Sequence, residues 1–463
     1  MPLAASQRLV RRLEGWRGAE INRKIMRALL TVGAATLGLK LTAVGRELAV
    51  AYQFGTSDLL DAFIIAFLPA SFAINVQIAA FAAALMPTFI RVGREEGEVA
   101  ALRVAESTLL GAVLMLIGTS LLLLALDDWL IGLLTGGFAP EKRALTIDLF
   151  HLLLPVILLQ GLARFYGTLL NARHRFGLVA TVPMATPLLT MLLLLAIGRP
   201  DPSLLVYGVV VGAALELALL LPLVRRLNLL VLPRWHGLDQ ATRRIMTQYF
   251  PIMLGALTGG TALMIDQGMA ALLGPGSVAT LSYGGKLIAL LLAFTARPLS
   301  AAILPFLADL AAADDGHRLR QTFYGWLGVI VTASLPVVAV LWLFSEPIVR
   351  LMFERGAFTA EDTALVALIQ GLYALQIPFY LAGALGSRVL NALSLNRVTA
   401  VIGILNCITN LVFDYVFMMW LGLPGIALAT SAVYFCSSLV ILFVVQRRLA
   451  HMCRGGSLAI GEA

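Results

Sequence analysis

The chain has 463 residues, of which 60% are hydrophobic and only 13% are charged, and its mean hydropathy is +0.90. Because soluble proteins have about a quarter charged residues, this composition excludes a water-soluble globular protein. The three cysteines, Cys407, Cys436 and Cys453, are too few and too scattered for a disulfide framework or a CxxC metal site.

Apolar stretches follow one another along the whole chain, and each is long enough to cross a bilayer at about 20 residues per span. Twelve of them lie near residues 27–53, 58–90, 105–126, 144–172, 176–198, 203–224, 245–273, 277–308, 321–347, 363–394, 398–420 and 425–446. None alternates apolar and polar residues as a transmembrane β-strand would, so we expect the spans to be helices.

Basic residues are concentrated in alternate loops. Of the 34 Lys and Arg residues, 23 lie in the amino terminus, the carboxyl tail and every second loop, and five lie in the other loops. Because short basic loops resist translocation, we predict a multi-pass protein of the cytoplasmic (inner) membrane with both termini in the cytoplasm. This topology accounts for the net charge of +8, so we expect no nucleic-acid partner.

The two halves of the chain resemble each other at an offset of 220 residues. GFAPEKRAL at 137–145 aligns with AFTAEDTAL at 357–365, and the tripeptide Leu-Asn-Ala occurs at 170–172 and again at 390–392. Each copy has six spans, an even number, so both copies enter the membrane in the same sense. We therefore predict an all-α polytopic membrane protein, with about 12 transmembrane helices in two parallel six-helix lobes around a central cavity. The predicted segments are a basic cytoplasmic amino terminus (1–26), an N-lobe (27–227), a cytoplasmic linker (228–244), a C-lobe (245–448) and a cytoplasmic tail (449–463).

Six basic residues lie inside the predicted spans, where a charge at mid-bilayer costs about 2.5–3.5 kcal/mol. They are Lys40, Arg46, Arg164, Lys286, Arg297 and Arg388. For Arg164 and Arg388, near span ends, snorkelling to the interface and a functional role are both open. The other four are deeper, and each repeat has two of them, which favours an anionic substrate between the halves. Glu47 and Asp61 could pair with Arg46, for which a structural ion pair and ligand binding are both open.

The stretch RELAVAYQFGTSDLLDAFIIAFLP, at residues 46–69, resembles the opening of the MurJ (MviN) lipid II flippases of the MOP (MATE-like) superfamily. The similarity continues through LLNARHRF (169–176), GPGSVATLSYGGKL (274–287) and MFERGAFTAED (352–362), as in a divergent twelve-span member. It implies two six-span lobes around a V-shaped cavity that carries a lipid-linked peptidoglycan precursor between leaflets. It also implies that Lys40, Arg46 and Lys286 are cavity bases. The predicted substrate-binding residues are Lys40, Arg46, Glu47, Asp61, Lys286 and Arg297.

A cation site is predicted in the second lobe. Asn410 and Asp414 are four residues apart, and Ile426 and Thr430 repeat that spacing on the next span, so each pair shares a helical face. Together with Asp266 they offer carboxylate, amide, hydroxyl and carbonyl oxygens, which are donors for hard cations. Because some MurJ-like proteins bind sodium at a similar site, the resemblance implies Na⁺ as a coupling ion. The alternative is a protonated Asp266 with Asp414 paired elsewhere.

The function that we predict is that of a flippase for a polyprenyl-diphosphate-linked sugar precursor, used in peptidoglycan biosynthesis or polysaccharide export. Its expected partners are that lipid-linked glycan and membrane lipids, and we expect a monomer with no covalent cofactor. The alternative is a MATE-type cation-coupled small-molecule or multidrug antiporter. We expect no enzyme, because the predicted inner loops are short and have no cluster of carboxylates or histidines.

Overall fold

The structure is a computed structural model that describes residues 31–453, without the side chains of residues 258–259, 297–298, 300–302 and 396. The basic amino terminus (1–26) and the end of the tail lie outside the described residues. Within the described range the chain is almost entirely helical and has no strand. A first helix covers residues 31–54. The following helices are α2 (Asp58–Glu95), α3 (Glu98–Ala125), α4 (Asp127–Leu134), α5 (Pro140–Leu153), α6 (Pro155–Ala172), α7 (Phe176–Thr181), η1 (Val182–Met184), α8 (Ala185–Ile197), α9 (Pro202–Arg226), α10 (Gln240–Ala270), α11 (Ser277–Ala312), α12 (Gly316–Leu343), α13 (Ser345–Phe353), α14 (Ala360–Ala374), α15 (Gln376–Ala392), α16 (Asn396–Leu421) and α17 (Leu423–Cys453).

The predicted all-α membrane fold is confirmed. After the helix over residues 31–54, 11 described helical segments are long and apolar enough to cross a membrane. They correspond one to one with the predicted spans from the second to the twelfth. Three of these segments consist of more than one helix: α5–α6, α7–η1–α8 and α14–α15. Between α5 and α6 the break comes directly before Pro155, which lacks the N–H that would continue the helix.

The helix bounds repeat along the chain as the sequence does. α5 begins at Pro140 and α14 at Ala360, and α6 and α15 end at Ala172 and Ala392. In each half a short helix, α4 or α13, comes before this pair and is itself preceded by a 28-residue helix, α3 or α12. The duplication therefore extends well beyond the residues that match.

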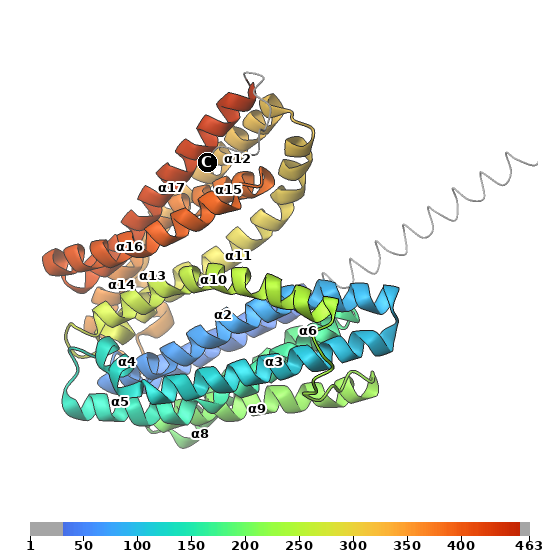
Figure 1. Cartoon of the computed structure of the whole chain (residues 1–463). Helices are drawn as coiled ribbons and strands as arrows, with labels where there is room; N and C mark the ends of the chain where they lie inside the picture. The colour runs from blue at the N-terminus through green and yellow to red at the C-terminus, as the bar shows by residue number, and fades with distance from the viewer. Residues whose placement is uncertain (1–30, 454–463) are drawn as a thin grey trace, which may run out of the picture.

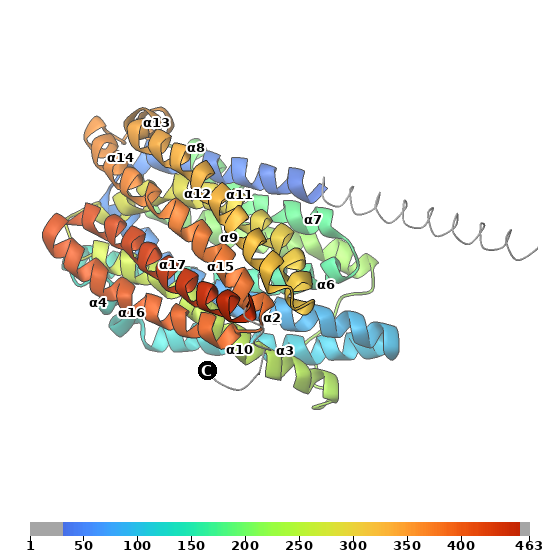
Figure 2. The same ribbon diagram turned by 90° about the horizontal axis from the view of Figure 1, so that it is seen from above.

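The helices form two bundles with α10 between them (Figure 1). Helices α2–α9 make up the first bundle and α11–α17 the second, and α10 packs against α2 of the first and α16 of the second. The bundles meet where α4, α13 and α14 lie, and their ribbons diverge toward the opposite ends. Seen from above, the second bundle covers part of the first (Figure 2).

In the first bundle, α9 packs very closely against α8. A Cβ atom at Gly208 would lie 2.8 Å from the Thr190 Cα, and one at Gly212 would lie 2.6 Å from the Thr186 Cα. Small residues four apart allow this approach, which matters in a membrane because lipid is as apolar as the helix surfaces. One turn later on α9, Glu216 accepts a hydrogen bond of 2.5 Å from the Thr186 hydroxyl.

Three turns close the end of the molecule where the bundles meet, and we call their contacts the turn seal. The Ala357 N–H donates to the Tyr52 carbonyl at 2.8 Å. Gly276 and Gly356 have φ angles of +75° and +63°, and a Cβ at either would overlap a carbonyl oxygen of the other half, that of Thr56 or Tyr52. The turn seal comprises residues 52–57, 274–279 and 355–362. Main-chain atoms of the two halves therefore come into close contact in the turn seal, and the Thr56 hydroxyl adds a side-chain hydrogen bond to Asp362.

Candidate functional site

The deep cations of the first and eighth spans meet across the two halves. Arg46 and Glu47 are neighbours on the helix over residues 31–54, and Lys286 projects from α11. The Glu47 carboxylate accepts hydrogen bonds from both the Arg46 guanidinium and the Lys286 ammonium. The Lys286 ammonium also lies 4.5 Å from the centre of the Tyr283 ring. These three charges, which we call the ion cluster, have a net charge of +1 and join one half to the other.

The ion cluster lines a cavity of about 210 Å³. Other polar side chains around it are Ser71 on α2, Thr190 on α8, Gln267 on α10 and Ser282 on α11, with apolar residues of α2 and α9 between them. The Gln267 Oε1 is buried and has no hydrogen-bond partner in the described part of the chain. The cavity thus combines two cations with hydroxyl and amide groups, which suits a phosphate-bearing or hydroxyl-rich ligand.

Asp61 does not line this cavity, and its predicted pairing with Arg46 is wrong. It is fully buried where α2 begins and accepts hydrogen bonds from the N–H groups of Gly276 and Ala279, at 2.8 and 2.7 Å. The Lys142 ammonium lies 2.8 Å from the same carboxylate. A carboxylate at these N–H groups stabilises the start of α11, so Asp61 holds the two halves together instead of facing a substrate.

Two predicted substrate residues, Lys40 and Arg297, remain to be placed. Lys40 is half-buried on the helix over residues 31–54 and is absent from the cavity lining. Arg297 belongs to α11, but its side chain is outside the described residues. Lys142, which the sequence places in an outer loop, has only 11% of its side chain exposed and pairs with Asp58 as well as Asp61. Two acids three residues apart at the start of a span, Asp58 and Asp61, are the sequence feature that indicates a basic partner such as Lys142.

The residues of the predicted cation site do come together. The Asn410 Nδ2 donates to Asp266 Oδ1 at 3.1 Å, and the Thr430 hydroxyl is 3.2 Å from Asp266 Oδ2 and 3.1 Å from the Ile426 carbonyl oxygen. The carboxylate of Asp414 lies against that of Asp266. Both Asp414 oxygens and the Asn410 Oδ1 are buried without a hydrogen-bond partner among the residues that the structure describes.

This donor set fits a hard cation. Two carboxylates in contact repel each other unless a proton or a cation neutralises one of them. The unpaired oxygens of Asp414 and Asn410 are ligands that such a cation prefers. Over residues 31–453, no group of three or more His, Cys, Asp or Glu side chains could hold a metal ion, so the structure gives no support for a transition-metal site.

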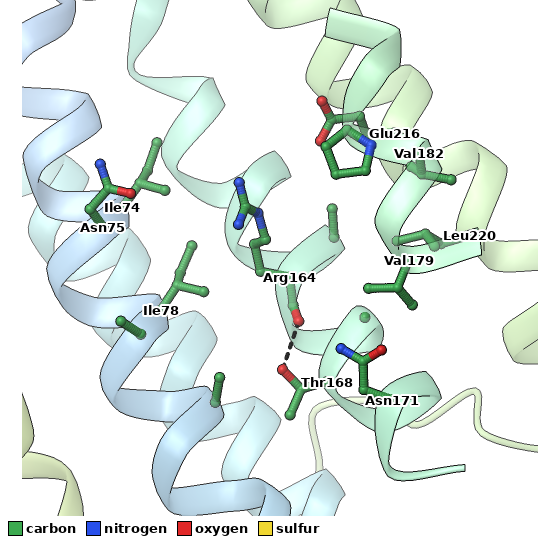
Figure 3. A pocket seen from close by; sticks show the side chains of 15 residues that line it. Ile74, Asn75, Ile78, Arg164, Thr168, Asn171, Val179, Val182, Glu216 and Leu220 are labelled. Atoms are coloured by element: carbon green, nitrogen blue, oxygen red, sulfur yellow. Dashed lines mark hydrogen bonds between the residues drawn. The ribbon is translucent and has the colours of Figure 1, made fainter. Parts of the chain in front are cut away.

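A second cavity, of about 280 Å³, lies inside the first bundle between α2, α6, η1 and α9 (Figure 3). Arg164 extends from α6 into it, with Asn75 of α2 on one side and Glu216 of α9 on the other. Arg164 therefore faces a cavity. The sequence signal was a polar face on α6, because Thr168 and Asn171 follow Arg164 after four and seven residues.

Residues 50–459 match the family model described as lipid II flippase MurJ. The chain belongs to the MurJ family. This MurJ-family chain is 29% identical to the probable lipid II flippase MurJ of Rhizobium tropici, over 94% of this chain and 83% of that protein. It is 25% identical to the lipid II flippase MurJ of Burkholderia cenocepacia, over 92% and 84% of the two chains. The resemblance seen at residues 46–69 is thereby confirmed.

Solved structures share the fold of this MurJ-family chain. A lipid II flippase MurJ in an inward closed conformation matches with a TM-score of 0.75 at 20% identity, over 92% of this chain and 90% of that one. An inward-facing multidrug resistance MATE family transporter of the MOP superfamily matches with a TM-score of 0.76 at 15% identity, over 90% and 96%. The prediction of a MOP-type fold is confirmed.

Proposed function

We propose that this protein is a flippase that moves a polyprenyl-diphosphate-linked sugar precursor, lipid II or another cell-envelope glycan intermediate, across the cytoplasmic membrane. The observation that carries the proposal is the ion cluster, in which one cation from each half meets at Glu47 beside a cavity. A diphosphate has the charge and the acceptor oxygens to replace the Glu47 carboxylate as the partner of Arg46 and Lys286. Family membership and the names of the relatives support a lipid-linked glycan as the substrate.

We infer that transport proceeds by alternating access of two lobes, residues 27–227 and 245–448, with both termini in the cytoplasm. The turn seal closes one end between the halves, and the bundles diverge toward the other end. In the ion cluster, only the Glu47–Lys286 contact joins the halves. A diphosphate that takes both cations from Glu47 replaces that contact and itself links the halves through Arg46 and Lys286, so the lobes can separate there once it leaves one of the two cations.

For the cation site we propose sodium as the occupant. Asp266, Asn410, Asp414, Thr430 and the Ile426 carbonyl would hold it, and a bound sodium would supply one positive charge, which offsets the charge of one of the two carboxylates. Asn410 and Thr430 orient Asp266 through their hydrogen bonds, which keeps its oxygens directed at Asp414. This assignment is supported by the unpaired Asp414 and Asn410 oxygens.

The second candidate is a MATE-type antiporter for cationic small molecules, favoured by the fold likeness to MATE transporters. Such a substrate needs an available acid in the cavity. Here Glu47 is already paired with two cations, which makes the cavity better suited to an anion.

The test is complementation of a MurJ-depleted bacterial strain, with a capsule- or exopolysaccharide-flippase mutant in parallel to identify the glycan. Wild-type protein is expected to restore growth in one of the two strains. Arg46→Gln and Lys286→Gln each remove a charge-assisted bond to the substrate, worth about 1.5–3 kcal/mol. Each single variant is therefore expected to lower the transport rate by roughly tenfold or more. The double variant is expected to be inactive. The control, Arg350→Gln, changes an exposed arginine that pairs with Glu346 and Glu354 on the same surface.

Full activity of the double variant, with normal membrane insertion, would refute the assigned role of the ion cluster. Resistance to cationic drugs without rescue of either strain would instead identify the antiporter. These outcomes separate the two candidate functions.

A further inference from the structure

The cavity around Arg164 is separate from the ion cluster. Its walls belong to the first bundle alone, and none of the residues around it lines the cavity of Arg46 and Lys286. With a volume of about 280 Å³ it is also the larger of the two. It therefore needs its own explanation.

Arg164 presents an available positive charge to this space. Its side chain is exposed although it lies in an apolar span, and its guanidinium makes no hydrogen bond or ion pair with another of the described residues. Glu216 lies within electrostatic reach, but its residue is only 4% exposed and its carboxylate is held by the Thr186 hydroxyl. The guanidinium therefore keeps all of its donors for a ligand.

The other polar groups around Arg164 fit a phosphate that is attached to a sugar. Asn75 and Asn171 can donate and accept hydrogen bonds, and the Thr168 hydroxyl, which donates to the Arg164 carbonyl at 2.9 Å, keeps its lone pairs for an incoming hydroxyl. A guanidinium binds a phosphate through two parallel N–H groups, which gives a defined orientation.

The apolar part of the wall fits a hydrocarbon chain next to that phosphate. Ile78 of α2, Val179 of α7 and Leu220 of α9 line the same cavity, and Figure 3 shows them below and beside Arg164. The combination of one cation, amides and branched aliphatic side chains matches the junction of a prenyl chain and a diphosphate. Free inorganic phosphate would use only the polar part.

Arg164 and the ion cluster are displaced toward opposite ends of the spans. Arg46 lies eight residues before residue 54, the helix end at the turn seal, which corresponds to about 12 Å. Arg164 lies eight residues before Ala172, where α6 ends. The chain leaves the turn seal at the start of α2 and then crosses three times, through α2, α3 and the α5–α6 pair. The end of α6 at Ala172 is therefore on the side remote from the turn seal. On the predicted topology it is the cytoplasmic side.

We propose that the Arg164 cavity is a second binding site, which takes the diphosphate and first isoprene units of the lipid-linked substrate on the side away from the turn seal. The inference rests on the proposed flippase function for the identity of the substrate. The phosphate is bound first by Arg164 and then by Arg46 and Lys286. It thus passes from one cationic site to the next and does not have to enter bulk hydrocarbon.

The test measures binding to the purified full-length protein in detergent, by calorimetry, with geranylgeranyl diphosphate and inorganic pyrophosphate as probes. The starting protein is the Arg46→Gln/Lys286→Gln double variant, so that the ion cluster does not contribute. It is expected to bind geranylgeranyl diphosphate at least tenfold more tightly than pyrophosphate. Adding Arg164→Gln is expected to weaken that binding by about tenfold or more, and Arg164→Lys by less, because a lysine keeps the charge but not the two-pronged geometry.

The matched control is Arg173→Gln, which changes the arginine directly after α6 that pairs with Glu98 at the surface. It is expected to leave binding unchanged. Absence of binding in the double variant, an equal effect of Arg164→Gln and Arg173→Gln, or pyrophosphate binding as tight as that of the prenyl probe would each overturn the proposal. Failure of the wild-type protein in complementation would refute the flippase function but would leave this binding result standing.

Discussion

Asp61→Asn should open the turn seal without changing the size of the side chain. The Asp61 carboxylate accepts two N–H groups from the start of α11 and faces the Lys142 ammonium, and it is fully buried. A carboxamide can still accept one of these bonds, but its NH₂ group faces donors where the second oxygen was. The other N–H bond and the bond with the Lys142 ammonium, each charge-assisted and worth about 1.5 kcal/mol, are lost, about 3 kcal/mol in total. Because 1.4 kcal/mol is a factor of ten, the open population rises about 100-fold.

Cysteine accessibility measures this change. Ser282 lines the cavity of the ion cluster, so Ser282→Cys can be labelled through an opened seal once Cys407, Cys436 and Cys453 have been replaced. The rate of labelling in intact cells by a maleimide that cannot cross the membrane is expected to rise up to about 100-fold in Asp61→Asn.

The matched control is Asp58→Asn, one turn earlier on α2. Asp58 also pairs with Lys142, but 49% of its side chain is exposed, and such surface pairs contribute about 0–1 kcal/mol. Its labelling rate should change by less than about fivefold. If Asp61→Asn, with an unchanged gel-filtration profile, is labelled no faster than Asp58→Asn, the role of Asp61 in the seal is refuted.

Two further predictions concern packing and the cation site. Gly212→Ala should lower the free energy of unfolding by about 1–3 kcal/mol, because its Cβ would press on the Thr186 backbone, whereas Gly118→Ala, with nothing within 4 Å, should be neutral or slightly stabilising. Equal shifts in the two melting temperatures would contradict the close α8–α9 contact. Sodium should raise the melting temperature of the detergent-purified protein more than potassium does, and Asp414→Asn should abolish the difference. Identical melting of the wild type in both salts would leave protons or the membrane potential as the driving force.

Much of the fold follows from sequence because the membrane imposes a simple rule. Every backbone polar group in hydrocarbon must be bonded within its own segment, so long apolar runs can be interpreted directly as helices. The cation site was also predictable, because Asn410 and Asp414 on one helix and Ile426 and Thr430 on the next have the spacing that places each pair on one face. The structure then adds the contacts of both pairs with Asp266.

The contacts of Asp61 and Arg164 could not be predicted in the same way. Asp61 bonds Gly276 and Ala279, more than 200 residues away, and nothing in the local sequence indicates that α11 begins beside α2. A single arginine near a span end has the same local pattern whether it reaches the membrane surface or a cavity. For Arg164 the difference depends on the positions of Asn75 and Glu216 on two other helices.

Closure through main-chain atoms constrains the length of the three turns more than their composition. Inserting one residue between Tyr52 and Thr56, or beside Gly356, would shift a carbonyl or an N–H out of register with its partner. Outside Thr56, Asp362 and glycines such as Gly276 and Gly356, side chains there can change without affecting these contacts. These turns can therefore diversify in sequence among related transporters while the number of residues in each stays constant. An alignment that showed frequent insertions at 52–57, 274–279 or 355–362 would mean that relatives close this end by other means.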